Sequence, residues 1–297
     1  MLWIRIFVSD FSLNSLKQNN YVLKVSVEYD VSYSYDNIVT INDNVLRVFP
    51  SKEFWQTPID EQVTITPTGK ELYYTDRFGN RNLRIKITEP HYSSYFKVIS
   101  TVETTPYKVT VDDDISLPLD KSIFSPDVRT YLNASTLINP DMIRQRAPDI
   151  VDNVKTLKEA LQVLTEWVTT NIEYVPASTT IQTKARESLA MGVGVCQDKA
   201  HILIGFLRSL GIPSRYVSGI LVDTPGATHA WAEAYWPNVG WIPLDPTHNR
   251  SFDLEHYYVK YGHGRDYNDV SPITGSFESD SPNSLTQLNV IPTIIPQ

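Results

Sequence analysis

The sequence predicts an α+β protein in which an antiparallel β domain precedes a domain of helices and strands. Residues 21–118 contain short alternating runs without helical periodicity, which is typical of strands. Residues 156–244 contain two apolar helical stripes followed by three strand-like runs, which favours segregated helices and strands. The 297 residues are enough for two domains of about 150 residues each. With 41% hydrophobic residues, the chain can bury a core and is not wholly disordered.

The first domain is expected over residues 1–118. Residues 21–35 alternate in polarity and are rich in Val, Tyr and Ser, as a half-buried strand should be. Turn-forming pairs such as Thr68-Gly69 and Gly79-Asn80 separate the strands that follow. Those further strands are expected at residues 45–48, 62–66, 72–74, 83–88, 95–103 and 108–111. Several short strands of this kind predict an antiparallel β-sandwich-like domain.

Residues 119–155 are expected to connect the two domains through irregular chain and short helices, because four prolines interrupt any regular pattern between residues 118 and 148. The clearest helix covers residues 156–172, where apolar residues recur at three- and four-residue spacing. A second helix is expected from Cys196 to about Ser209. Gly211 is its stop signal, and Pro213 lies just beyond.

The second domain is expected over residues 156–297. After its two helices come strand-like runs at residues 216–222, 230–236 and 241–244. A final strand is expected near residues 285–291, within a tail that is rich in Ser, Pro and Thr. No internal repeat is visible, so the second half is interpreted as a single mixed unit with a carboxy-terminal extension.

The charge and the hydropathy of the chain exclude some classes of partner. With 26 basic and 34 acidic residues, the net charge of −8 is opposite to that of a protein that neutralises phosphates. No run approaches the ~18–20 apolar residues that span a bilayer. The apolar start carries Arg5 and Asp10 and lacks the features of a secretory signal. We therefore expect no nucleic-acid or membrane partner and a cytoplasmic location.

The chain has a single cysteine, Cys196, which excludes an intramolecular disulfide and a cysteine-rich zinc site. Two glycines precede it at the expected start of a helix. Unpaired backbone N–H groups and the positive end of the helix dipole favour a thiolate there. The same N–H groups could hold an oxyanion. A lone cysteine can also be a buried apolar residue, and only its setting favours a nucleophile.

A nucleophilic cysteine needs a base and a group that orients the base. His229 begins one expected strand, and Asp245 ends the next. If these strands are antiparallel neighbours, both side chains meet at one sheet edge, where the helix that carries Cys196 can face them. Taken singly, His229 could be a structural histidine beside Trp231, and Asp245 before a proline is a common turn residue.

The remaining polar residues have simpler interpretations. His201 lies five residues after Cys196, about 140° away around the helix, and is a poor base. The segment at residues 76–80 is interpreted as a hairpin turn. Five further polar residues could suggest metal ligands, but their irregular spacing favours solvated side chains over a metal site. They are His248, Asp253, His256, His263 and Asp266.

Motifs around these residues carry a family resemblance. They are GVCQD at 194–198, LGIPSRYVSG at 210–219, HAW at 229–231, GW at 240–241 and DPT at 245–247. Together they resemble the transglutaminase-like superfamily, and more narrowly its bacterial members, which are often classed as cysteine proteases. DRFGN at 76–80 is similar to the amino-terminal β domain of that family, and GRDYNDVSP at 264–272 to its carboxy-terminal signature. The resemblance covers nearly the whole chain apart from about the first twenty residues.

The resemblance implies a papain-like fold with a transglutaminase core and a Cys–His–Asp triad. Cys196 matches the nucleophile, His229 the acid and base, and Asp245 the residue that orients the imidazole. The backbone N–H of Cys196 is a candidate oxyanion donor, with Gln182 or Tyr174 as a candidate side-chain donor. Animal relatives use calcium, but the chain has no acidic calcium-binding loop, so no metal or other cofactor is expected.

The expected reaction is cysteine-dependent acyl transfer on an amide bond through a thioester, with a peptide or protein as the amide donor. Water as acceptor makes the enzyme a peptidase or amidase, and an amine makes it a crosslinking transglutaminase. Hydrolysis is preferred, because a crosslinking enzyme must exclude water and nothing in the sequence indicates a tunnel that would do so. The alternative to an enzyme is a non-catalytic binding or scaffold protein that uses its β domain as the working surface. The oligomeric state is not predicted.

Overall fold

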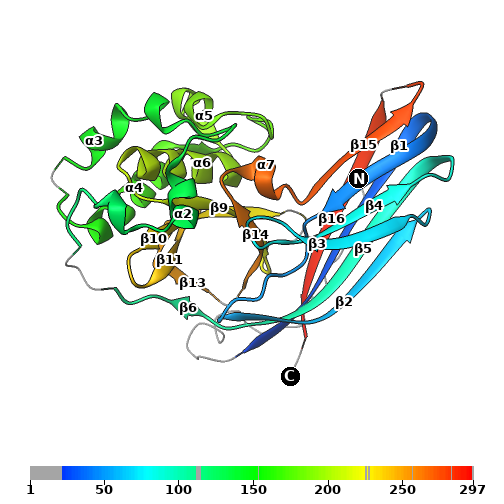
Figure 1. Cartoon of the computed structure of the whole chain (residues 1–297), viewed down its shortest axis with the longest axis horizontal. Coiled ribbons are helices and arrows are strands. Elements are labelled where there is room, and N and C mark those ends of the chain that lie inside the picture. The colour runs from blue at the N-terminus through cyan, green and yellow to red at the C-terminus, as the bar shows by residue number, and fades with distance from the viewer. Residues whose placement is uncertain are drawn as a thin grey trace.

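A computed structural model describes residues 22–111, 115–152, 154–224, 226, 228–255, 257–281 and 283–295. The chain forms two units that lie side by side (Figure 1). One is a long antiparallel sheet and the other is a smaller sheet with helices over one face. This arrangement confirms the predicted α+β class. Among the described helices, none is long and apolar enough to cross a membrane.

The large sheet has seven strands and is organised around one very long strand, β1 (Leu23–Leu46). The first half of β1 lies between β5 and β16, and the second half lies between β4 and β15. Strand β2 pairs with β5 on its outer side, and β3 pairs with β4 in the same way. The bounds are β2 (Gln56–Thr66), β3 (Lys70–Thr75), β4 (Arg81–Ile87), β5 (His91–Thr104), β15 (Ile273–Ser279) and β16 (Ser284–Ile294).

Two sequence-based expectations about this unit need correction. The strands predicted at residues 21–35 and 45–48 are one strand, whose pairing with β5 is irregular between Ser34 and Val39. The segment 156–297 is not one domain, because β15 and β16 pair with β1 and extend the amino-terminal sheet. Pairing between residues more than 200 positions apart leaves no local pattern in the sequence. The predicted final strand at 285–291 is nonetheless present within β16.

The smaller sheet has the strand order β12–β11–β10–β9–β14, with every neighbouring pair antiparallel. Helix α6 (Cys196–Ser209) packs on β9 and β10, and α4 (Leu157–Asn171) and α5 (Ala185–Met191) pack against α6. The strands are β9 (Ser214–Leu221), β10 (His229–Trp236), β11 (Gly240–Asp245), β12 (Arg250–Ser251) and β14 (Tyr258–Gly264).

Shorter elements connect these parts. The short helices are η1 (Lys121–Ile123), α2 (Pro126–Arg129), η2 (Thr130–Leu132), η3 (Pro140–Met142), α3 (Arg146–Ile150) and α7 (Tyr267–Val270). The short strands are β6 (Tyr107–Lys108), which pairs with β13 (Asp253–Leu254), and β7 (Glu173–Tyr174), which pairs in parallel with β8 (Val193–Gly194). The predicted irregular connection over residues 119–155 is therefore a series of single helical turns.

Both predicted helices form, and local chemistry explains their ends. Thr156 caps α4 by accepting a hydrogen bond from the Glu159 N–H, and the Glu159 carboxylate accepts one from the Thr156 N–H in return. Helix α6 stops before Gly211, whose φ of 80° is in the left-handed region that glycine tolerates. Residues 197–208 of α6 are all buried, so this helix is the centre of its unit.

Two apolar cores hold the molecule together. The helix-facing alanines of β10, at positions 230, 232 and 234, are buried in one core with α4 and α6. Small side chains there let α6 approach the sheet closely. The second core joins the two units, because the inner face of β1 packs with Ile220 of β9 and with Val259 and Tyr261 of β14. The position of the small sheet thus depends on the large one.

A buried ion cluster lies on the face of the small sheet that is opposite to the alanines of β10. The Glu233 carboxylate of β10 is 2.5 Å from the Arg215 guanidinium and 2.9 Å from the Lys260 ammonium. Lys260 also lies 3.2 Å from Glu53, which precedes β2. The Arg215 guanidinium stacks over the Trp241 ring at 4.1 Å. The cluster therefore links three strands of the small sheet to the chain of the amino-terminal unit.

Replacing Glu233 with alanine is expected to destabilise the protein strongly, because two buried cations lose their shared partner. Loss of one partner from a buried pair costs about 3–5 kcal/mol. Chemical denaturation of the Glu233→Ala protein measures this cost. Asp43→Ala, which removes the partner of the exposed Arg84, is the control and should shift the midpoint far less. Equal shifts in both variants would contradict the role assigned to the cluster.

Candidate active site

Cys196 is the first residue of α6, and the chain before it is shaped to place it there. A Cβ on Gly194 would lie 2.6 Å from the Asp198 side chain and 2.7 Å from the Ser188 hydroxyl, so only glycine fits. The Asp198 carboxylate accepts hydrogen bonds from the Val195 N–H at 2.9 Å and from the Thr179 hydroxyl at 2.6 Å. These contacts fix the first turn of α6 and leave the thiol, which is free and partly buried, at the positive end of the helix.

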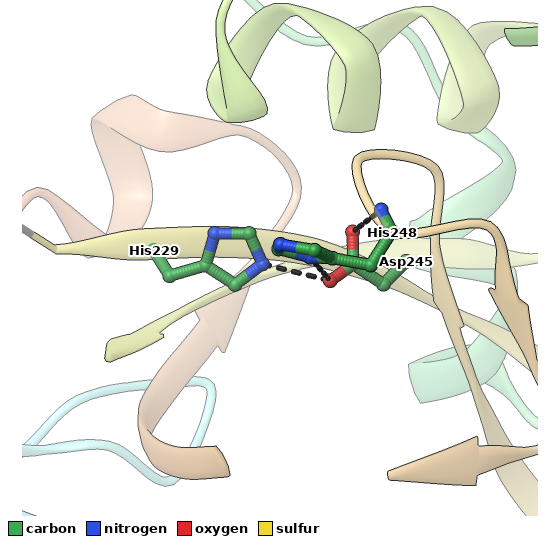
Figure 2. Close-up of side chains that lie close together, drawn as sticks. All are labelled: His229, Asp245 and His248. Atoms are coloured by element: carbon green, nitrogen blue, oxygen red, sulfur yellow. Dashed lines mark hydrogen bonds and ion pairs between the residues drawn. The ribbon is translucent and has the colours of Figure 1, made fainter. Parts of the chain in front are cut away.

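His229 and Asp245 meet as predicted from the strand order. His229 is the first residue of β10, Asp245 is the last residue of β11, and these two strands pair in antiparallel fashion. The Nε2 atom of His229 lies 2.8 Å from the Oδ2 atom of Asp245 (Figure 2). Cys196 lies close to the same imidazole, because its thiol contributes to the raised pKa of His229. The structure thus brings together all three predicted site residues.

The electrostatics of the pair follow from burial and charge. Burial lowers the pKa of His229, but the charge and hydrogen bond of Asp245, aided by the Cys196 thiol, outweigh it and raise this pKa to about 10. Burial raises the pKa of Asp245, but the two histidines that face it lower this pKa well below its usual range. The Asp245 carboxylate is therefore ionised and favours the imidazolium form of His229.

Asp245 has two further side-chain partners that the sequence analysis did not assign to the site. The Nδ1 atom of His248 lies 2.8 Å from Oδ2, and the Tyr258 hydroxyl donates to the same oxygen at 2.7 Å. The other oxygen, Oδ1, accepts the backbone N–H groups of Thr247 and His248. His248 directly follows the DPT motif, which is a signal that could have identified it. Tyr258 lies on β14, and nothing in the sequence near Asp245 points to it.

Of the two candidate side-chain oxyanion donors, the structure places Tyr174 near the thiol. Tyr174 ends β7, pairs with Gly194 two residues before Cys196, and is half exposed. Burial and the nearby Cys196 raise the pKa of its hydroxyl. Gln182 lies on an exposed turn after β7, where its backbone N–H bonds to Thr180. Tyr174 is therefore the better placed of the two.

His201 is remote from this chemistry, as expected. It is fully buried in α6, its Nε2 faces the backbone N–H of Tyr267 at 3.2 Å, and burial lowers its pKa to about 4. The five residues considered for a metal site do not converge where they are described. Asp253 pairs with Arg250, and Asp266 caps α7. His256 lies outside the described residues.

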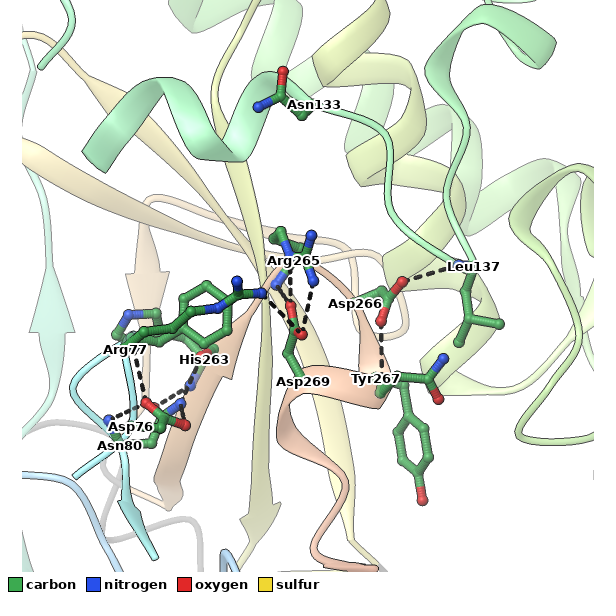
Figure 3. A network of polar contacts seen from close by, with 12 residues as sticks. Asp76, Arg77, Asn80, Asn133, Leu137, His263, Arg265, Asp266, Tyr267 and Asp269 are labelled. Carbon is green, nitrogen blue, oxygen red and sulfur yellow. Dashed lines mark hydrogen bonds and ion pairs between the residues drawn. The ribbon is translucent and has the colours of Figure 1, made fainter. Parts of the chain in front are cut away.

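The predicted hairpin turn at 76–80 forms and attaches the large sheet to the second unit. The Asp76 carboxylate accepts the N–H groups of Phe78 and Asn80 within the turn. The Asn80 side chain then donates to the His263 carbonyl and accepts the His263 N–H (Figure 3). Beside it, Arg77 and Arg265 share the Asp269 carboxylate of α7. This network supports β14, which carries Tyr258 into the candidate site.

The His229–Asp245 pair should stabilise the fold in a defined pH window. Stability from the lowered pKa of Asp245 is present above its ordinary value of 3.8 and is lost as the pH falls below it. Stability from the raised pKa of His229 is complete below 6.5 and is lost as the pH rises from there through about 10. The difference in melting temperature between the protein and its Asp245→Asn variant should therefore be largest between about pH 4 and 6.5.

Both proteins should carry Cys196→Ala, so that ionisation of the thiol does not contribute. Asp43→Asn is a matched control, because the partner of Asp43 is an arginine whose charge does not change in this range. Its effect should stay flat from pH 6.5 to 10. A flat difference for Asp245→Asn across the same range would contradict the expected pair.

Comparison with known proteins agrees with this architecture. Residues 144–246 match the model of the transglutaminase-like superfamily, and residues 25–103 match the bacterial transglutaminase-like N-terminal region. An uncharacterized protein of Mycobacterium leprae is 27% identical over 286 residues, covering 90% of this chain and 97% of that protein. An uncharacterized protein of Mycobacterium tuberculosis is 29% identical over 286 residues, covering 89% of this chain and 90% of that protein.

A crystal structure from Cytophaga hutchinsonii, titled as a "Putative Cysteine Protease", shares the fold of both units. It superposes with a TM-score of 0.80 at 23% identity, covering 93% of this chain and 92% of that one. The two family models fall on the two units of the fold, the amino-terminal sheet and the unit that carries Cys196, His229 and Asp245. The chain belongs to the transglutaminase-like superfamily and carries the bacterial amino-terminal region of that family.

Proposed function

We propose that this protein is a cysteine-dependent acyl-transfer enzyme that acts on amide bonds, with water as the acceptor. The observation that carries the proposal is the chain of contacts from Asp245 through His229 to the Cys196 thiol at the start of α6. A thiol, an imidazole and a carboxylate in this order are the parts that nucleophilic catalysis at a carbonyl requires. The partner is accordingly a peptide or protein that supplies the amide.

In the first half of the reaction, the Cys196 thiolate attacks the carbonyl carbon and forms a new C–S bond. The negative charge moves to the carbonyl oxygen, which the backbone N–H of Cys196 and the Tyr174 hydroxyl would stabilise. The C–N bond then breaks, and the proton on Nδ1 of His229 passes to the leaving amine. This step leaves a thioester on Cys196 and a neutral His229.

In the second half, a water molecule attacks the thioester carbon while His229 removes its proton. The C–S bond breaks, the acid product leaves, and the thiolate–imidazolium pair is restored. Asp245 keeps the same role throughout, because its hydrogen bond holds the His229 ring with a proton on Nε2 and leaves Nδ1 for proton exchange. The other four donors to Asp245 keep that carboxylate ionised and immobile.

The rate at which Cys196 is alkylated should depend on His229. We expect iodoacetamide to alkylate Cys196 well below pH 8, because an imidazolium and a helix N-terminus both favour the thiolate. In His229→Ala, the pH midpoint of the alkylation rate should rise toward about 8.5, the ordinary value for a thiol. His263→Gln is the control and should leave the midpoint unchanged. Mass spectrometry of the intact protein measures this rate directly, since Cys196 is its single cysteine.

The acceptor is tested with peptide pools. Cleaved peptides with a free acid would support hydrolysis, and loss of cleavage in Cys196→Ala would assign it to this thiol. If a primary amine is added and amine adducts of the peptides form, the acceptor is an amine, and the proposed hydrolysis would be replaced by crosslinking. An unperturbed alkylation profile together with equal cleavage by Cys196→Ala would contradict the enzyme and favour a binding protein.

Tyr174→Phe should lower kcat about 10²–10³-fold if its hydroxyl stabilises the oxyanion, which is the usual effect of removing one such donor. KM and the pH midpoint of alkylation should change little, because the donor acts on the tetrahedral species. Gln182→Ala is the matched control for the other candidate donor and should retain activity. Comparable losses in both variants, or none in Tyr174→Phe, would remove Tyr174 from this role.

A further inference from the structure

His248 turns the Asp245 end of the candidate site into a cluster of three ligating groups. The Nε2 atom of His229, the Nδ1 atom of His248 and a carboxylate oxygen of Asp245 all lie within 4.8 Å of one another. Figure 2 shows the two rings directed at the same carboxylate from two different segments, β10 and the turn after β11. Catalysis by the proposed triad needs one of these histidines, so the second is free for another role.

We propose that His229, Asp245 and His248 bind a divalent transition-metal ion, for which Zn²⁺ is the probe, and that the bound ion switches the triad off. Two imidazoles and one carboxylate form a three-ligand set that zinc accepts, with a fourth position for water. The bonds from the ion to nitrogen and oxygen are about 2.0–2.2 Å. The two N···O separations of 2.8 Å therefore need only a small opening to admit it.

Exposure and hydrogen bonding suit this use of the cluster. The Asp245 side chain is fully buried, whereas 42% of the His248 side chain is exposed, so an ion from solvent would enter past His248. The Tyr258 hydroxyl and the Thr247 N–H already hold the carboxylate in place. Partners of this kind orient ligands in metal sites and strengthen binding.

The consequence for catalysis rests on the proposed function. In the active arrangement, the Nε2–H group of His229 donates its hydrogen bond to Asp245, and Nδ1 exchanges a proton with the thiol. An ion on Nε2 displaces that proton to solvent and leaves the ring with its one proton on Nδ1. The ring then has no lone pair for the thiol proton or for that of the attacking water. Zinc at this site would therefore inhibit by disabling the base and would not need to bind Cys196.

Zinc binding is measured first in Cys196→Ala, by competition with a chromophoric chelator after treatment with EDTA. We expect one Zn²⁺ per chain, with affinity close to that of the unsubstituted protein. His248→Asn in the same background keeps a hydrogen-bond donor for Asp245 but removes the ligand. It should weaken binding at least about 10-fold, since even partners outside the ligand shell contribute that much. Mg²⁺ and Ca²⁺, which prefer oxygen ligands, should not compete.

His263→Gln is the matched control, because it removes a histidine of β14 that lies outside the cluster, and it should bind zinc normally. Loss of zinc binding in Cys196→Ala would overturn the proposal in favour of a thiolate site. Full binding in His248→Asn with an unchanged melting temperature would also overturn it, because His248 would then not be a ligand. Reversal by EDTA of zinc inhibition in the unsubstituted protein would support the switch. Zinc binding is measured in Cys196→Ala, which lacks the nucleophile. Its result is therefore independent of whether the proposed activity is correct.

Discussion

A carboxylate without solvent contact must receive its hydrogen bonds from the protein, and the arrangement around Asp245 meets this requirement. Its donors come from three places: His229 at the start of β10, the turn that follows β11, and Tyr258 on β14. An unpaired buried charge would cost several kcal/mol. The hydrogen bonds to the Asp245 carboxylate therefore hold these three segments together. The same contacts that satisfy Asp245 also orient His229 toward the thiol.

The thiol reaches this point because of a second constraint, the close packing of α6 on the small sheet. Alanines at positions 230, 232 and 234 line the sheet face beneath the helix, where larger side chains would push it outward. At the helix start, Gly194 admits the side chains of Asp198 and Ser188 into space that a Cβ would occupy. Small residues on the sheet and before the helix therefore determine how far Cys196 lies from His229.

These constraints explain which parts of the site could be predicted from the sequence. His229 and Asp245 lie at the ends of neighbouring strands, and Cys196 lies at a helix start, so local patterns suffice to bring them together. Tyr258 reaches Asp245 only because β14 pairs with β9, and the network around Asn80 then supports β14. A contact that depends on such tertiary pairing has no local signature. His248 is intermediate, since its position after the DPT motif is visible but its ring direction is not.

The same reasoning applies to the fold, and it bears on why the two units stay together. The amino-terminal strands are predictable from alternation, but β15 and β16 come from the far end of the chain and pair with β1. The chain thus leaves the large sheet, forms the small one and returns to the large one. Ile220 and Val259 of the small sheet are buried against the inner face of β1 between these crossings. Separating the units would break strand pairing and expose this core. The strand β14 that supplies Tyr258 is therefore held in place by the amino-terminal sheet, which links a region without catalytic residues to the geometry of the candidate site.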